Sequence, residues 1–328
     1  KIAAGEVIER PSAVVREHLD NCFDAFAKNL RITFSNGGVK EIEVADDGDG
    51  IFFDDLKLAI LKHTTSKIKD FEDILKTRSM GFRGEALSSI ASISRLKITS
   101  FNGREEHGGE LYSEAGENIS LAPFVRKKGT TINVQDIFFN IPARKKFLKS
   151  IKAEARSILD VVTTKIIPFP DVSISVINDD KTSLQLQKDT LINRIYSLFT
   201  DFVKKDSLIE IPLQPLENEI TIYGFIGNPY LFYHNRTYQY YYVNNRPVTI
   251  PSLYYSISSS FEGLIPSGKF PVCFIFIEIN PEIIDVNIHP AKKEIRFIND
   301  SLVTMLLKKS IADAFKKGFT VPDIKFRD

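Results

Sequence analysis

Residues 16–25 read REHLDNCFDA, and the fold prediction starts from this stretch. It forms the middle of an amphipathic helix predicted from Ser12 to Lys28, whose successive residues turn by about 100°. Apolar side chains then collect on one side of the helix: Val14, Val15, Leu19, Cys22, Phe23 and Phe26. Glu17 and Asn21 lie one turn apart on the opposite side. A carboxylate and a carboxamide so placed can hold a water and a hydrated Mg²⁺, although a solvated polar face is the commoner origin of such an arc.

Length and composition bound the class of protein. A chain of 328 residues exceeds one ordinary core, so two domains are expected, residues 1–204 and 205–328. Hydrophobic residues make up 43% and charged residues 26%, which is typical of a globular protein. The net charge of +1 indicates neither nucleic acid nor membrane as a partner, so such contacts require local patches.

Targeting and redox signals are few. No apolar run approaches the roughly 18 residues of a membrane span, and no signal peptide is recognisable. Cys22 and Cys273 are the only cysteines, which gives neither a disulfide framework nor metal-ligand spacing and fits a reducing compartment. The chain starts at Lys1 without an initiator Met, so we expect a trimmed fragment that lacks both true termini.

A hairpin follows the first helix. Residues 31–36 and 40–44 alternate as two strands around the turn Gly37-Gly38, and the second strand leads into the loop DDGDG at 46–50. One carboxylate in this loop could accept a hydrogen bond from an exocyclic amine such as that of adenine. An ordinary acidic turn is the alternative. A calcium loop would need a Glu at its twelfth position, where Lys57 stands.

Three later stretches could contact phosphates or line a pocket. His63 to Lys67 offers hydroxyls and a lysine, although a capped loop explains it equally well. Glycines in GFRG, residues 81–84, precede a predicted helix, where free N–H groups favour anions. Neither a P-loop nor G-x-G-x-x-G occurs. The strand that opens with Gly129-Thr130 has the composition of an ordinary β-strand. The alternative is that its Gly and Thr line the floor of a pocket.

A basic run occupies residues 143–156, where we predict one helix. Its only acid is Glu154, and its cations are Arg144, Lys145, Lys146, Lys149, Lys152 and Arg156. A solvated face is the commoner explanation, and contact with a phosphate backbone is the alternative. Beyond residue 204 most segments are predicted to be strands. The tyrosines at 238 and 240–242 favour packing within strands over stacking on nucleic-acid bases.

Taken together, these motifs resemble a known set. The helix with Glu17 and Asn21, the DDGDG loop, the GFRGEA turn and the GT strand resemble, in this order, the ATP-binding motifs of the gyrase, heat-shock chaperone, histidine kinase and MutL superfamily. Within it, the chain resembles the MutL family of mismatch-repair ATPases through KIAAGEVIERPSAVV (1–15), HTTSKI (63–68), GFRGEALSSI (81–90), FFNIPARKKFL (138–148) and DVNIHPAKKEIRF (285–297). The resemblance extends from Lys1 to about Phe297.

The resemblance implies a role for each matching position. Glu17 would activate the hydrolytic water, Asn21 would bind Mg²⁺, Asp46 would read the adenine amine, and Lys292 would reach the γ-phosphate from the second domain. Other ATP contacts would come from Gly50, Thr130, the region beside the lid (Thr64, Thr65, Ser66, Lys67) and the lid turn (Gly81, Phe82, Arg83, Gly84). The implied fold is α+β: a two-layer α/β sandwich that binds ATP, then a smaller α/β domain resembling a ribosomal-protein fold.

The implied activity is slow Mg²⁺-dependent ATP hydrolysis in a bacterial cytoplasm. It would drive homodimerisation and engagement of DNA and of mismatch-recognition and downstream repair proteins, with no membrane partner and no endonuclease site in this part of the chain. Asp47 stands where Asn is frequent and puts a second acid beside Asp46. Two alternatives remain: a non-enzymatic DNA-binding module built on Arg144, Lys145, Lys149 and Lys152, or another superfamily member such as a topoisomerase.

Overall fold

The computed structural model describes residues 8–61, 86–213, 220–281, 284–285 and 296–318. The chain divides into two compact units, residues 1–194 and 195–328. The boundary predicted from the sequence, 204/205, falls just after the helix α7 (Leu191–Leu198), which spans this division. Within the described ranges, no helix combines the length and the apolar character needed to cross a bilayer.

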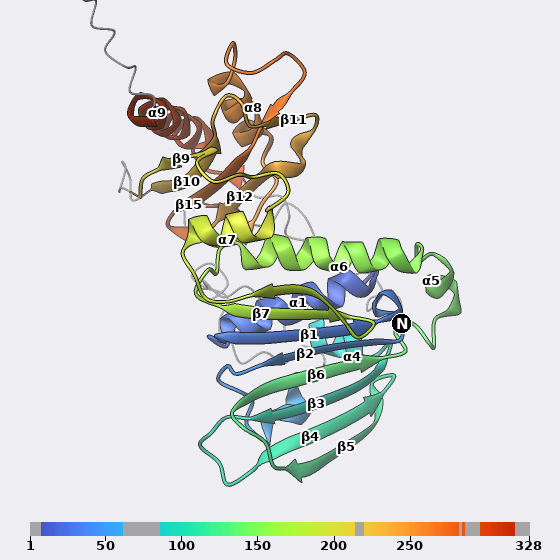
Figure 1. Cartoon of the computed structure of the whole chain (residues 1–328). Coiled ribbons are helices and arrows are strands. Elements are labelled where there is room, and N and C mark those ends of the chain that lie inside the picture. Colours follow the sequence, from blue (N-terminus) through green and yellow to red (C-terminus); the bar gives the residue numbers. More distant parts are fainter. Residues whose placement is uncertain (1–7, 62–85, 214–219, 282–283, 286–295, 319–328) are drawn as a thin grey trace, which may run out of the picture. The chain divides into compact units, whose positions relative to one another are not determined.

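The first unit is built on an eight-stranded sheet with strand order β5-β4-β3-β6-β2-β1-β7-β8. Its strands are β1 (Asn29–Ser35), β2 (Glu41–Asp46), β3 (Arg95–Phe101), β4 (Gly108–Glu114), β5 (Glu117–Phe124), β6 (Gly129–Gln135), β7 (Ser173–Asn178) and β8 (Lys181–Leu186). Its helices before α7 are α1 (Pro11–Asp24), α2 (Asp55–Ala59), α4 (Ala86–Ala91), α5 (Pro142–Lys146) and α6 (Ile151–Ile166). In Figure 1, α1, α4 and α6 lie on one side of this sheet, which is the two-layer α/β arrangement expected from the sequence.

Alternation along the strands explains the two layers. In β1 the even positions Leu30, Ile32 and Phe34 are buried, while their neighbours are exposed or half-buried. The predicted hairpin is confirmed: β1 pairs antiparallel with β2, and Ile32 lies opposite Val44. On the other side, β2 pairs antiparallel with β6. A continuous apolar face therefore forms beneath α1 and stabilises the central strands.

The same register sets the position of the polar loop. Asp46, the last residue of β2, lies opposite Thr130, the second residue of β6. The DDGDG loop thus starts beside the GT pair, although 84 residues separate Asp46 from Thr130 in the chain. Since α1 packs on β2, the loop also begins next to the first helix.

Two sequence predictions about helices are wrong. Helix α1 ends at Asp24 rather than at Lys28, and Phe26, expected on the buried side, is 75% exposed with a left-handed φ of 57°. The basic run is not one helix, because the chain leaves the helical path between α5 and α6, and Ser150 caps α6 by accepting a hydrogen bond from Ala153 N at 3.3 Å.

The second unit holds a five-stranded sheet with strand order β13-β12-β15-β10-β9. Its elements are β9 (Leu208–Ile211), β10 (Thr221–Gly227), β11 (Phe232–Tyr233), β12 (Gln239–Val243), β13 (Arg246–Pro247), α8 (Pro251–Ser260), β14 (Phe270–Pro271), β15 (Cys273–Glu278), β16 (Ile284–Asp285), β17 (Arg296–Phe297) and α9 (Asp300–Gly318). Residues of α8 and α9 share a buried core with one face of the sheet.

Three of the four clustered tyrosines lie in β12 of this second sheet, whereas Tyr238 ends the short 3-10 helix Arg236–Tyr238 before it. Tyr241 faces the helices, whereas Tyr240 and Tyr242 stack on Phe274 and Phe276 of the adjacent strand β15. Tyr241 and Tyr242 are fully buried. The expectation of strand packing is confirmed for these residues.

Candidate functional site

Helix α1 carries two of the expected site residues. Glu17 and Asn21 are both half-buried and lie one turn apart on α1. The helix is tied to α6 by polar contacts at both ends. Near its start, Ser157 Oγ donates to Ser12 Oγ at 2.9 Å, and near its end Lys165 Nζ lies 2.6 Å from Asp20 Oδ1.

The Asp20–Lys165 ion pair is almost fully removed from solvent, with about a tenth of each side chain exposed. A buried charge of this kind requires its partner, because an unpaired carboxylate is poorly solvated inside a protein. This contact therefore fixes how α1 lies against α6, and with it the direction in which Glu17 and Asn21 point.

The Asp46 carboxylate is held by three donors. Its Oδ1 accepts the backbone N–H of Gly48 at 2.8 Å and that of Thr130 at 3.3 Å. Its Oδ2 accepts the Cys22 thiol at an S···O distance of 3.6 Å. Burial raises the pKa of Asp46 above its ordinary value, and these hydrogen bonds offset only part of that effect. Asp46 is thus an oriented, poorly solvated acceptor at the end of β2.

Two glycines let the surrounding backbone close on this acid. A Cβ on Gly129, whose φ is 122°, would lie 2.1 Å from the backbone oxygen of Asp46. A Cβ on Gly50, whose φ is 73°, would lie 2.2 Å from the backbone oxygen of Phe101. Both positions require glycine to pack strand against loop. Approach of a nucleobase to Gly50 stays a prediction.

Asp47 has a different role from the one expected of a second acid. Its Oδ1 accepts the backbone N–H groups of Lys28 at 2.8 Å and Asn29 at 2.9 Å, and its Oδ2 accepts Asn29 Nδ2 at 2.7 Å. Burial acts to raise the pKa of Asp47, but these hydrogen bonds outweigh it and leave the pKa below its ordinary value. Asp47 thus fastens the turn between α1 and β1 rather than adding a second acceptor beside Asp46.

Sequence reasoning missed two residues that shape the site. Ser100 on β3 accepts the Ile51 N–H at 2.8 Å and lies 2.9 Å from Thr130 Oγ1, so it joins the loop to β6. Arg126 donates to the carbonyl oxygen of Thr99 and, at 3.1 Å, to its hydroxyl, and its positive charge acts on Asp46. Neither residue belongs to a recognisable motif: Ser100 reaches the site through the pairing of β3 with β6, and Arg126 lies in the connection between β5 and β6.

Several predicted site residues lie outside the described residues. They are the lid and lid-adjacent residues Thr64, Thr65, Ser66, Lys67, Gly81, Phe82, Arg83 and Gly84, together with Lys292. Of the described site residues, Asp46 contacts Thr130, Gly50 lies in the loop after Asp46, and Glu17 and Asn21 lie on α1, whose Cys22 contacts Asp46. The expected convergence of Lys292 on this group stays a prediction.

The basic residues divide into two kinds. Arg144 donates to the backbone oxygen of Ile8 at 2.9 Å, so it anchors the segment that precedes α1. Lys145, Lys149 and Lys152 are exposed. The acid of the run, Glu154, is fully buried and accepts the backbone N–H of Lys149 at 2.9 Å, so its charge does not screen these lysines at the surface.

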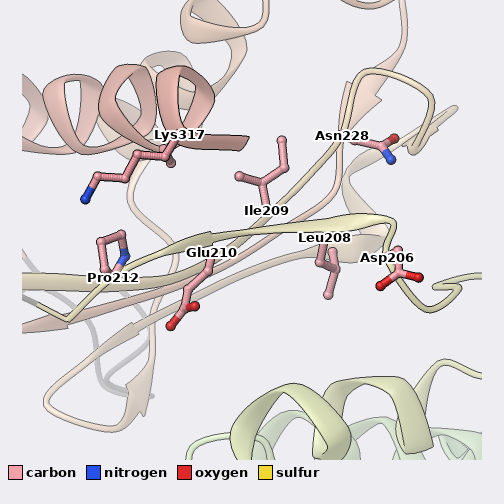
Figure 2. Close-up of a pocket in the computed structure, with 8 residues that line it drawn as sticks. Asp206, Leu208, Ile209, Glu210, Pro212, Asn228 and Lys317 are labelled. Carbon is pink, nitrogen blue, oxygen red and sulfur yellow. The ribbon is translucent and has the colours of Figure 1, made fainter. Parts of the chain in front are cut away.

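A shallow hollow of about 480 Å³ lies in the second unit. Figure 2 shows its lining, with Glu210 on β9 and Lys317 on α9 among the labelled side chains. It mixes apolar and charged groups without a concentrated chemistry. None of the described residues expected to bind ATP lines it, so it is not assigned a role.

Comparisons with known proteins show the family of the chain. Residues 9–113 match the family "Histidine kinase-, DNA gyrase B-, and HSP90-like ATPase", and residues 196–316 match "DNA mismatch repair protein, C-terminal domain". The DNA mismatch repair protein MutL of Clostridium botulinum is 39% identical over 337 aligned residues, which cover the whole of this chain and 50% of that protein. The chain thus spans about half the length of the curated relatives it matches.

Solved structures show the same fold. A crystal structure of the N-terminal domain of a DNA repair protein matches with a TM-score of 0.77 and 28% identity, covering 96% of this chain and 97% of that one. The Aquifex aeolicus MutL ATPase domain complexed with ADP shares the fold, with a TM-score of 0.65, 23% identity, and coverage of 93% and 98%. With both family models matched in sequence order and 39% identity to a MutL protein along its whole length, the chain belongs to the MutL family of DNA mismatch-repair proteins.

Proposed function

We propose that this chain binds ATP with Mg²⁺, hydrolyses it slowly and couples that cycle to DNA mismatch repair. The observation that carries the proposal is the Asp46 carboxylate, a half-buried acceptor held by Gly48 N–H and Thr130 N–H at the end of β2, which packs against the helix that bears Glu17 and Asn21. Such an acceptor suits an exocyclic amine, because a nucleobase lacking that amine would leave the carboxylate without its donor. Asp46 would therefore select adenine.

The donor set on α1 fits Mg²⁺. This ion commonly takes one or two protein oxygens and fills its other positions with waters and phosphate oxygens. Asn21 offers one amide oxygen on a half-buried face. In the described ranges no three His, Cys, Asp or Glu side chains gather as a metal cluster. When bound, the ion would neutralise charge on the phosphates.

Glu17 would act as the general base. Its carboxylate oxygen would take a proton from the attacking water, for which geometry matters before pKa. Asn21 holds the adjacent position one turn away, so water and ion would share one side of α1. Lys292, Thr65, Ser66, Lys67 and the Gly81–Gly84 turn would bind phosphate oxygens, as electrostatic stabilisation of phosphoryl transfer requires.

The coupling to repair is part of the same proposal. Because the chain spans about half of its relatives, the activity of the whole protein is proposed from the family and this site together. ATP binding would favour a homodimer that contacts DNA and mismatch-recognition and downstream repair proteins. We expect no endonuclease activity from this part of the chain.

Removing the proposed base separates binding from hydrolysis. In Glu17→Ala, calorimetry should give an ATP dissociation constant within about threefold of wild type, while phosphate release falls by about 100-fold or more. The matched control is Glu117→Gln on the exposed strand β5, which should change neither quantity. Unchanged turnover in Glu17→Ala would contradict the assignment of the base.

A DNA contact is a second candidate function, favoured by the exposed lysines from α5 to the first turn of α6. Lys145, Lys149 and Lys152 gather there while the acid of the run points inward. Reversing charge in Lys145→Glu with Lys149→Glu should weaken duplex DNA binding and reduce the salt slope by about 2, since each phosphate contact contributes roughly 0.9. Lys181→Glu, at the exposed first residue of β8, is the control. Undiminished binding by the double variant at low salt would exclude this contact.

A further inference from the structure

The Cys22 thiol is buried beside the acid that would read the nucleobase. Cys22 is 4% exposed on α1, directly after Asn21, and its Sγ lies 3.6 Å from Asp46 Oδ2. This distance is within the range of a hydrogen bond from sulfur, which is a weak donor. The contact crosses from the helix to the end of β2 and joins the two elements that carry the candidate site.

The two oxygens of Asp46 are used differently. Oδ1 already accepts two backbone N–H groups, from Gly48 and Thr130. Among the described residues, the Cys22 thiol donates to Oδ2. A carboxylate oxygen has room for two donors, so Oδ2 can take the thiol and one more. Oδ2 is therefore the oxygen on which a nucleobase amine would find a free acceptor position.

The thiol is the donor in this contact, because a carboxylate oxygen can only accept a hydrogen bond and the S–H group supplies the hydrogen. A protonated thiol fixes the plane of the carboxylate without displacing an incoming amine, since one S–H occupies one lone pair. With an apolar side chain at residue 22, only the two hydrogen bonds to Oδ1 would restrain rotation of the Asp46 carboxylate.

We propose that Cys22 is a positioning residue for adenine selection: its thiol orients Asp46 Oδ2 toward the exocyclic amine of the nucleobase. This inference rests on the proposed ATP binding at the same site. According to this proposal, Cys22 affects which purine the site prefers, in addition to packing in the core of the first unit.

Comparing ATP with inosine triphosphate tests the proposal, because the inosine base has a carbonyl where adenine has the amine. Calorimetric titration of both nucleotides should show that wild type prefers ATP. In Cys22→Ala the ATP affinity should fall about two- to fivefold, the lower part of the range for a hydrogen bond, with inosine triphosphate affinity changed by less than about twofold. Cys22→Ser, which keeps a donor, should retain most of the preference.

A control separates positioning from packing. Val15→Ala removes buried carbon from the same helix and carries no donor, so it should lower the melting temperature while leaving the ATP to inosine triphosphate ratio unchanged. Equal losses for both nucleotides in Cys22→Ala, or no loss, would overturn the role of the thiol. If wild type bound neither nucleotide, the proposed function itself would fail, and this inference with it.

Discussion

The loop after β2 contains two neighbouring acids with opposite surroundings. Asp46 points inward, where burial raises its pKa and three donors hold it. Asp47 points outward, where hydrogen bonds from the turn after α1 lower its pKa. Two consecutive residues therefore have different roles: Asp46 is the proposed acceptor for the ligand, and Asp47 stabilises the turn between α1 and β1. In this loop, the direction of a side chain determines what its charge can do.

The largest effect should separate these two acids by nucleotide affinity. Asp46→Asn replaces an acceptor oxygen by an amide donor, so we expect ATP affinity to fall about 100-fold, as for loss of a hydrogen bond to a charged group. Asp47→Asn should change ATP affinity by less than about threefold, because both oxygens of Asp47 are bonded to Lys28 and Asn29. Calorimetric titration of the two variants checks this, and equal losses would remove the distinction.

Ion pairs in the first unit should differ in the same way. Lys165→Met leaves Asp20 without its buried ion-pair partner and should lower the unfolding free energy by about 3–5 kcal/mol. Lys128→Met removes the ion-pair partner of Asp49, and both side chains of that pair are at least half exposed. This variant should change the free energy of unfolding by only about 0–1 kcal/mol. Urea denaturation measures both, and similar values would mean that burial does not set the strength of these pairs.

A smaller effect should appear in the acid dependence of stability. The pKa of Asp47 is lower in the folded state, so its contribution is fully present above the ordinary value of 3.8 and is lost as pH falls through the lowered value. Wild type should therefore lose more stability than Asp47→Asn when the pH is taken from about 5 to below that lowered value. Thermal unfolding across this range gives the comparison, and parallel curves would show that the charge of Asp47 contributes nothing.

Local pattern was enough to predict the opening elements. Alternation in β1 and β2 with Gly37-Gly38 between them predicted the hairpin, because one face of each strand must be buried. The position of Phe26 could not be obtained this way, since α1 ends at Asp24 without a glycine to mark its end. The break before Ser150 did have a signal, because serine is a preferred N-cap residue.

The site contacts depend on pairing between distant segments. Cys22 and Asp46 meet across 24 residues, and Asp46 and Thr130 across 84, and no local period encodes either contact. Motif resemblance supplied Glu17, Asn21, Asp46 and Thr130 as residues, but the inward turn of Asp46 and the outward turn of Asp47 follow from β-sheet register. Register is set by the whole sheet, so a single stretch of sequence does not determine it.

A crystal structure of this chain with Mg²⁺ and a non-hydrolysable ATP analogue is the most direct test of the central claim. The account predicts the adenine amine within hydrogen-bond distance of Asp46 Oδ2, the Asn21 amide oxygen on the ion, and the Glu17 carboxylate facing the γ-phosphate. A nucleotide bound elsewhere, or bound here with Glu17 directed away from the phosphates, would contradict it.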